Sequence, residues 1–482
     1  MSVATAKSAL ERFTNIREDE LAAALWAALY FFVLLGSNYL LRPLRETMGV
    51  RGLEKMPLMY TGTLVFTLLA NPAVALLVRR FPRRAFIPYV YRFFQLNLLI
   101  LYAAFMLLSK ERQTALPYVL FIWVSVYNYI IISVFWGFLV DLFSHEQGRR
   151  LFPMIGAGGT IGGIAASTFT SSLVERIGPF NLLLICILLL EVAIFCVGRL
   201  ARRYRLPTEH ADVSDSPVPE MAVPASAGLA LAATTSSAKS ISAGGVGAPV
   251  TVTWYTGLVR TVRSPYLLGI CGFLLLMAIT STFLYFQQTQ IVKDAITSDA
   301  ERTAYFARID KYVNVATLLA QVLLAGRLIT WFGVGLTMLV LPVVSAVGFW
   351  SLAATPTLGL TVAQNLTLLL VVQTVRRSSD YAIARPAREV LFTVVPRADK
   401  YVAKNFIDTF VYRLGDQIGA WTAASGWMKS MATNLPGLGG LILVICGVWS
   451  VICLWLGRAQ RRREVASDPA AALQIANPTR LP

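Results

Sequence analysis

The chain has 482 residues, of which 56% are hydrophobic and 14% are charged, and its net charge at pH 7 is +17. A mean hydropathy of +0.61 excludes an ordinary soluble domain and predicts a polytopic membrane protein. In a soluble chain the basic excess would suggest nucleic-acid binding. Here the Lys and Arg residues collect in short connections between apolar runs, so membrane topology explains the charge and no nucleic-acid partner is expected.

Apolar runs long enough to cross about 30 Å of hydrocarbon predict twelve transmembrane helices, six on each side of a central break. The first six lie near residues 21–41, 57–78, 86–108, 117–140, 151–173 and 180–198. The second six lie near 265–288, 311–330, 334–354, 358–378, 402–425 and 437–457. The segment ERFTNIREDE before the first run mixes acids and bases, so we expect no cleaved signal peptide.

The break predicts four domains: a six-helix bundle over 1–198, a linker over 199–262, a second six-helix bundle over 263–457 and a tail over 458–482. The middle of the linker is rich in Ala, Ser, Pro and Gly, so it is expected to be disordered and cytoplasmic. Its end, near Trp254 to Val262, predicts a short interfacial helix because Trp254, Leu258 and Val262 share one face.

The distribution of basic residues predicts the orientation of the chain. With the N-terminus inside, 29 Lys and Arg lie on the inner side and 12 on the outer side. This asymmetry favours both termini in the cytoplasm.

Six plus six helices joined by a long linker resemble the layout of the major facilitator superfamily, whose halves contain inverted three-helix repeats. One short echo fits such a symmetry. The sequence RPLRE begins at Arg42 after the first run, and RPARE begins at Arg385 after the tenth. If the echo reflects the repeat, an Arg/Glu cluster guards each mouth of a central cavity.

Residues 376–416 carry many ionisable side chains between two apolar runs. Such charges are costly near bilayer depth and usually face a bundle interior or a water-filled cavity. Arg377, Tyr381, Arg385 and Glu389 recur every four residues, so we expect them to share one helix face. The alternative is a cytoplasmic loop whose charges lie in water, and we accept it for 397–400.

These patterns predict an alternating-access transporter for an anionic solute, because arginine binds phosphate or carboxylate in a bidentate manner and keeps its charge. The predicted substrate-binding or gating residues are Arg42, Arg45, Glu46, Asn128, Arg385, Arg388, Glu389, Asp408, Tyr412, Arg413 and Asp416. Glu191, alone in an apolar run, is a candidate for proton coupling, although a structural, partner-bonded Glu is the commoner case. Arg92 is expected to snorkel toward the cytoplasmic interface rather than enter the cavity.

Other motifs point to packing rather than to chemistry. The glycines between 156 and 163 lack the Lys-Ser/Thr of a phosphate loop, and their four-residue spacing is typical of closely packed membrane helices. With two histidines and five scattered cysteines, no metal site is expected. Catalytic constellations are missing, so we expect neither an enzyme nor a cofactor.

Three segments, GSNYLLRPLRETMGV, SVFWGFLVDLFSHEQGRRLFPMIGAGGTIGG and ARPAREVLFTVVPRADKYVAKNFIDTFVYRLGD, resemble the ATP/ADP translocase family of plastids and intracellular bacteria, with its free-living bacterial relatives. The resemblance implies twelve helices, a bacterial inner-membrane location and exchange of ATP for ADP. It also assigns a functionally important basic residue to Arg45. The chain departs from the family at Asp416, where the exchangers carry Lys, and at Val124–Ser125, where they carry an acid.

The sequence therefore predicts a monomeric secondary transporter of an anionic, nucleotide-like solute, with ATP or ADP among the candidates. Two alternatives stay open. One is a transporter of the same fold for an organic anion or a lipid-linked substrate, which would show a lateral opening lined by Phe and Arg. The other is a membrane sensor or assembly protein that binds without transporting.

Overall fold

The computed structural model describes residues 18–80, 83–203, 254–396, 403–404, 406–425 and 435–467. Within these residues the regular structure is helical and no strand occurs. The chain divides into two compact units. Unit 1 holds the residues up to 249 together with 289–314, and unit 2 holds 250–288 and the residues from 315 onward.

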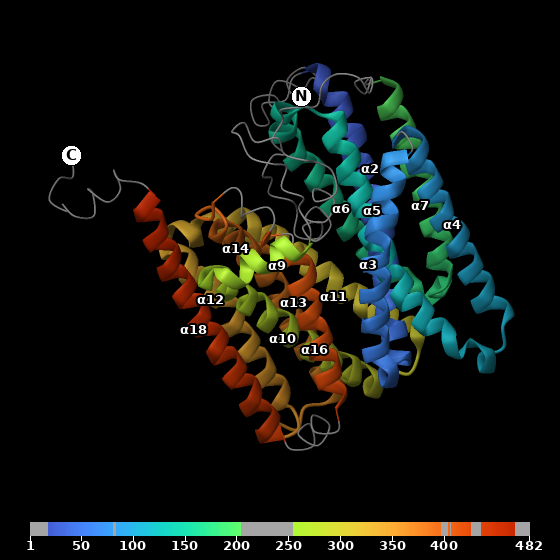
Figure 1. The fold of residues 1–482 in the computed structure, drawn as a ribbon. Helices are drawn as coiled ribbons and strands as arrows, with labels where there is room; N and C mark the ends of the chain where they lie inside the picture. The colour runs from blue at the N-terminus through green and yellow to red at the C-terminus, as the bar shows by residue number, and fades with distance from the viewer. Residues whose placement is uncertain are drawn as a thin grey trace, which may run out of the picture. The chain divides into compact units, whose positions relative to one another are not determined.

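Unit 1 is built on α2 (Glu18–Arg51), which packs against α5 (Leu116–Leu142), α6 (His145–Ile177) and α7 (Asn181–Arg203). Its other long helices are α3 (Met56–Arg80), which packs on α5, and α4 (Arg83–Leu107), which packs on α7 (Figure 1). The core is strongly aromatic. The rings of Phe31 and Phe135 stack with their centroids 4.2 Å apart, and Trp136 meets Phe31 edge-on.

Unit 2 contains α9 (Trp254–Arg263), α12 (Gly326–Ala353), α13 (Val362–Ser379), α14 (Arg385–Leu391), α16 (Tyr412–Ala424) and α18 (Leu435–Ser467). The boundary between the units falls within α10 (Pro265–Ala295) and α11 (Asp299–Ala320). In unit 2, α12 packs against α18 and α13. The predicted helix at 254–262 is present as α9, whereas 204–253 and 468–482 lie outside the described residues.

Helix α2 continues ten residues beyond the predicted end at 41, through Pro43 to Arg51. Proline inside a helix removes one hydrogen bond and clashes with the preceding turn, so Pro43 carries a local cost. The extension persists because its apolar side chains are buried: Leu44 and Met48 are 0% exposed. Tertiary packing outweighs the local cost of Pro43, and the extra turns carry Arg42, Arg45 and Arg51 into unit 1.

Local signals set other helix boundaries, and α6 extends beyond the predicted range 151–173 at both ends. Ser144 begins α6 with a capping box to Gln147, and Gly178, at φ 82°, ends it. Gly333, at φ 72°, breaks the helical backbone between the predicted spans 311–330 and 334–354. Only glycine adopts such a φ at little cost, so this break is encoded locally.

Eight helices are long and apolar enough to cross a membrane, judged over the described residues. In the described residues the predicted ranges 57–78 and 311–330 are helical, 358–378 is helical from Val362, and 402–425 is helical up to Ala424. None of these four ranges is among the eight. The last three carry several ionisable or amide side chains, which suit helices that border an aqueous interior. Twelve spans and the domain limits at 198 and 263 remain predictions.

Candidate functional site

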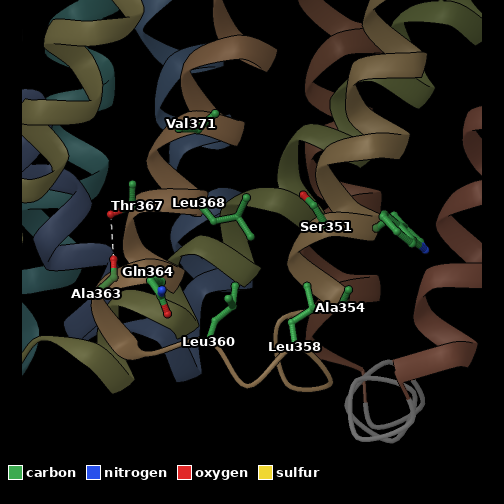
Figure 2. A pocket seen from close by; sticks show the side chains of 10 residues that line it. Ser351, Ala354, Leu358, Leu360, Ala363, Gln364, Thr367, Leu368 and Val371 are labelled. Carbon is green, nitrogen blue, oxygen red and sulfur yellow. Dashed lines mark hydrogen bonds between the residues drawn. The ribbon is translucent and has the colours of Figure 1, made fainter.

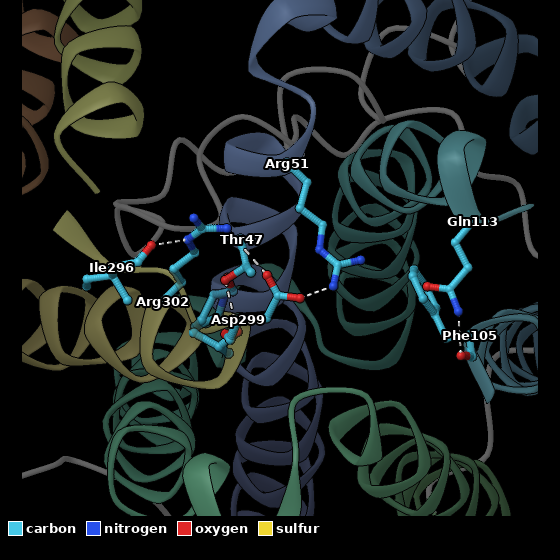
Figure 3. A network of polar contacts seen from close by, with 9 residues as sticks. Thr47, Arg51, Phe105, Gln113, Ile296, Asp299 and Arg302 are labelled. Carbon is cyan, nitrogen blue, oxygen red and sulfur yellow. Dashed lines mark hydrogen bonds and ion pairs between the residues drawn. The ribbon is translucent and has the colours of Figure 1, made fainter. Parts of the chain in front are cut away.

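A polar cluster in unit 1 joins the C-terminal half of α2 to the N-terminal half of α11; we call it the α2–α11 cluster. Arg51 forms an ion pair with Asp299, which also lies 3.5 Å from Arg302 (Figure 3). One turn earlier on α2, the buried Thr47 hydroxyl lies 2.9 Å from that of Thr303. These contacts tie the start of α11 to the end of α2.

Deeper along the same two helices, the α2–α11 cluster continues with two further contacts. Arg42 lies 3.7 Å from Asp310, whose side chain is only 3% exposed. Tyr39 donates a hydrogen bond of 2.9 Å to Asn314. The contacts recur at each turn of α2, so the two helices form one continuous polar seam.

Arg45 is turned away from α11 and toward α5. Its guanidinium donates to Ser125 at 2.9 Å and pairs with Glu46 at 2.9 Å. It also lies 4.0 Å from the centre of the Phe121 ring. Asn128 is one turn beyond Ser125 on α5, and its buried Oδ1 accepts no hydrogen bond from the described residues. The structure thus brings Arg45 and Asn128 to neighbouring turns of one helix surface.

In unit 2, a π-helical turn at Asp380–Ala384 lies between α13 and α14. A π-helical turn contains more residues than an α-helical turn. Arg385 accordingly pairs with Asp380, five residues earlier, at 3.3 Å, rather than with a residue four positions away. Arg385 also lies 4.5 Å from the Tyr381 ring. Arg385 and Glu389 do not form an ion pair with each other, because Glu389 pairs with Lys404.

A second π-helical turn, Ile407–Val411, precedes α16 and carries Asp408. Arg388 lies 3.4 Å from Asp408 and 3.9 Å from Glu389. Asp408 is 8% exposed, so this pair is largely withdrawn from solvent. The sequence analysis named Arg388, Glu389 and Asp408, and the structure brings them together.

On α16, Arg413 and Asp416 lie 3.6 Å apart, one helical turn from each other. Thr282 of α10 donates to Asp416 at 3.4 Å. Tyr412 is close enough to Asp416 and Arg385 to interact with both electrostatically. Arg413 and Asp416 thus contact each other within unit 2, whereas Asp408 pairs with Arg388.

Arg376 of α13 is a central residue that the sequence analysis did not single out as a site residue. It is 4% exposed, and its guanidinium donates to Ser345 of α12 at 3.0 Å and to Ser281 and Thr280 of α10 at 3.0 and 3.5 Å. None of the ion pairs seen among the described residues includes Arg376. We call these three hydroxyls the hydroxyl cradle of Arg376. They lie on two helices far from Arg376 in sequence, so no local sequence pattern predicts that they contact it.

The two echoed motifs make parallel contacts in their own units. The first arginine of each pairs with an aspartate: Arg42 with Asp310, and Arg385 with Asp380. The second arginine pairs with the glutamate that follows it and with a side chain of another helix. That side chain is Ser125 for Arg45 and Asp408 for Arg388. The types of partner match, but Asp310 lies on another helix whereas Asp380 lies five residues before Arg385.

Glu191 of α7 lies apart from these clusters. It accepts a hydrogen bond of 2.9 Å from Gln95 and lies 3.7 Å from Arg92, both on α4. Its side chain is 55% exposed. The structure gives Glu191 polar partners on an outer face of unit 1 rather than an enclosed position.

A groove of about 600 Å³ lies between the end of α12 and the start of α13 (Figure 2). Its walls are mainly apolar, with polar groups from Ser351, Gln364 and Thr367. None of the predicted site residues lines it, and neither does any Phe or Arg. It therefore lacks the lining expected of a lateral opening for a lipid-linked substrate.

No protein-family model and no curated protein matches the chain. Solved structures do match over nearly all of it. An auto-inhibited POT family peptide transporter is 14% identical, with a TM-score of 0.57, over 91% of this chain and 96% of its own. Another POT family transporter, at 14% identity and a TM-score of 0.59, covers 92% and 98%. A bacterial homologue of the lysosomal transporter Spinster, inward-facing and unoccupied, gives 13% identity and a TM-score of 0.52 over 91% and 98%.

The chain has the major facilitator-type fold. The predicted fold class and membrane location are thereby confirmed. The expectation that the chain is not an enzyme agrees with the transporter descriptions of the neighbours reported above.

The expected membership of the ATP/ADP translocase family is wrong, because the structural neighbours of this major facilitator-type chain are peptide transporters and a Spinster homologue. Exchange of ATP for ADP and nucleotide binding have no support. The physical reason lies in what the resembling segments do. Their glycines pack helices and their arginines form internal ion pairs, so the shared pattern reflects packing of the fold.

Proposed function

We propose that this protein is a secondary transporter that moves a small solute bearing an anionic group by alternating access, with both chain ends cytoplasmic. The fold supports the mode of action, since the solved structures that share it are described as transporters. Which solute it carries is argued below from the charges of the chain itself.

The observation that carries the proposal is the α2–α11 cluster. Alternating access needs contacts that hold one mouth closed and separate when that mouth opens. The pairs Arg51–Asp299 and Arg42–Asp310 link two helices more than 240 residues apart in sequence, at the predicted outer end of α2. We assign them to an outer gate that is closed in this structure.

The charge balance of unit 2 supports an anionic solute. The described part of 376–416 contains six cations and four acids, so it has an excess of two positive charges. The cations are Arg376, Arg377, Arg385, Arg388, Lys404 and Arg413, and the acids are Asp380, Glu389, Asp408 and Asp416. A bound carboxylate or phosphate would offset that excess, and arginine is suited to either group.

Ligand binding is tested first, by thermal unfolding of the purified protein with inorganic phosphate, dicarboxylates, sugar phosphates, nucleotides and dipeptides. Dipeptides belong in the panel because four of the neighbours are POT transporters, three of them described as peptide transporters. A ligand present at 100 times its Kd stabilises the folded state by about 2.7 kcal/mol. We expect a shift with one anionic class and none with a neutral analogue of the same size.

Movement is tested second, by uptake of that ligand into proteoliposomes. We expect uptake that saturates with solute and depends on an opposing solute or proton gradient. Binding without movement would overturn the transporter assignment in favour of a sensor. Stabilisation by a neutral solute alone, followed by uptake of it, would keep the transporter and overturn the anionic substrate.

A further inference from the structure

An exposed ion pair joins α4 to α7 in unit 1, and it involves no residue of the α2–α11 cluster or of the charged clusters in unit 2. Arg92 of α4 lies 3.7 Å from Glu191 of α7, and Gln95 of α4 donates to Glu191 at 2.9 Å and to the Ile187 carbonyl at 3.1 Å. The Arg92 and Glu191 side chains are 64% and 55% exposed. A fixed pair of opposite charges is therefore presented outward.

The pair lies at membrane depth. The candidate spans are Phe86–Leu107 for α4 and Asn181–Arg202 for α7. At about 1.5 Å per residue, Glu191 is roughly 15 Å from either end of its span, which is the midplane of a bilayer about 30 Å thick. Arg92 was expected to snorkel toward the cytoplasm, but its guanidinium extends to Glu191 instead.

Apart from Gln95, the pair is flanked by large hydrophobic side chains that are also exposed. Tyr89, Phe93 and Leu96 flank it on α4, and Leu188 and Phe195 flank it on α7. Lipid chains satisfy such apolar side chains but offer no partner to a guanidinium or a carboxylate. A polar group in this setting is normally covered by another helix, to which it forms hydrogen bonds.

We propose that this face binds a second copy of the same chain, forming a two-fold symmetric dimer through α4 and α7. The argument is charge complementarity. Under a two-fold axis, Arg92 of each copy faces Glu191 of the other, so two cations and two acids alternate at the centre of the contact. A partner of any other kind would have to supply both charges itself, whereas this chain already carries them.

Charge reversal in differently tagged copies of the full chain tests the proposal. Arg92→Glu leaves two acids on the face, and Glu191→Arg leaves two cations. Each variant alone is expected to lose at least tenfold in co-capture of the two tags from the membrane. Co-expression of the two variants pairs an acidic face with a basic one, and we expect co-capture to return to at least a third of the wild-type value.

The mixed experiment separates association from folding. In each single variant the internal Arg92–Glu191 pair stays broken, so recovery on mixing comes only from contact between copies. Val347→Glu on α12, an exposed apolar position elsewhere, serves as the control and is expected to leave co-capture unchanged.

Counting of fluorescent subunits in lipid bilayers gives a second readout, with two steps of photobleaching expected for wild type. Single-step bleaching of wild type at every protein-to-lipid ratio would overturn the proposal. So would co-capture that neither single variant reduces, or a loss in each single variant that mixing does not reverse. This dimer differs from the monomer expected from the sequence and does not depend on the transport proposal.

Discussion

The guanidinium of Arg42 on α2 lies 3.7 Å from the carboxylate of Asp310 on α11, and the Asp310 side chain is 3% exposed. A buried acid is costly without a nearby cation, so this contact constrains how the two helices meet. Arg42→Ala is expected to lower the free energy of unfolding by about 1–3 kcal/mol. Thermal unfolding of the purified variant provides the measurement.

Asp310→Asn is the matching variant, because it removes the negative charge that pairs with Arg42. If the two side chains act together, the double variant should lose less stability than the sum of the single ones. Additive losses would show that Arg42 and Asp310 contribute independently.

Arg51 pairs with Asp299 at the rim of the α2–α11 cluster, one helical turn beyond Thr47, which is 0% exposed. Under the gate assignment, Arg51→Ala weakens the closed outer mouth. A Thr47→Cys reporter should then react with a membrane-impermeant maleimide several-fold faster, since about 1 kcal/mol corresponds to about a fivefold change in population. The five native cysteines provide the background rate in the parent chain. Unchanged labelling would remove Arg51 from the gate.

Arg376 donates to three hydroxyls on α10 and α12 and is almost fully buried. Arg376→Ala leaves those hydroxyls without their donor, and we expect a loss of about 1–3 kcal/mol or more in stability together with loss of uptake. Arg376→Lys keeps the charge but not the planar fork, so it should recover stability only in part. Arg327→Ala, at an exposed position, is the control. Wild-type stability in Arg376→Ala would show that the cradle is not structural.

Arg45 is the cation that the sequence predicted to matter most, and it is only partly exposed between Ser125, Glu46 and the Phe121 ring. Arg45→Ala is expected to abolish uptake into proteoliposomes, with a normal yield of folded protein by size-exclusion chromatography. Arg199→Ala, which removes an exposed arginine from α7, should transport normally. Intact uptake in Arg45→Ala would exclude this residue from the transport site.

Gly162 of α6 sits against the backbone carbonyl of Phe32 on α2, so a Cβ there would overlap main-chain atoms that cannot move aside. Gly162→Ala is expected to reduce stability by about 1–3 kcal/mol despite the better helix propensity of alanine. Gly198→Ala on α7, where a Cβ meets nothing within 4 Å, should be neutral or stabilising by up to about 1 kcal/mol. Equal effects at the two sites would contradict the packing role.

Local patterns in the sequence were sufficient for the fold class and for most helix positions. Apolar runs set by bilayer thickness located the helices, and Gly178 and Gly333 mark breaks because a positive φ favours glycine. The glycines of α6 were correctly interpreted as packing residues, since small side chains are what close helix contact requires. The dense charge of 376–416 likewise marked Arg388 and Asp408 as candidate residues, but it did not predict that they pair.

Only the tertiary structure decided which of these side chains meet. Arg42 and Asp310 are 268 positions apart, and nothing in the periodicity of either segment pairs them. The π-helical turn at Asp380–Ala384 shifts Arg385 onto Asp380, and the hydroxyl cradle of Arg376 draws on two other helices. A sequence determines by itself what depends on neighbouring residues, such as helix formation and membrane insertion. Partners of buried charges depend on long-range packing, which in this chain extended α2 past Pro43 and brought Arg42 to Asp310.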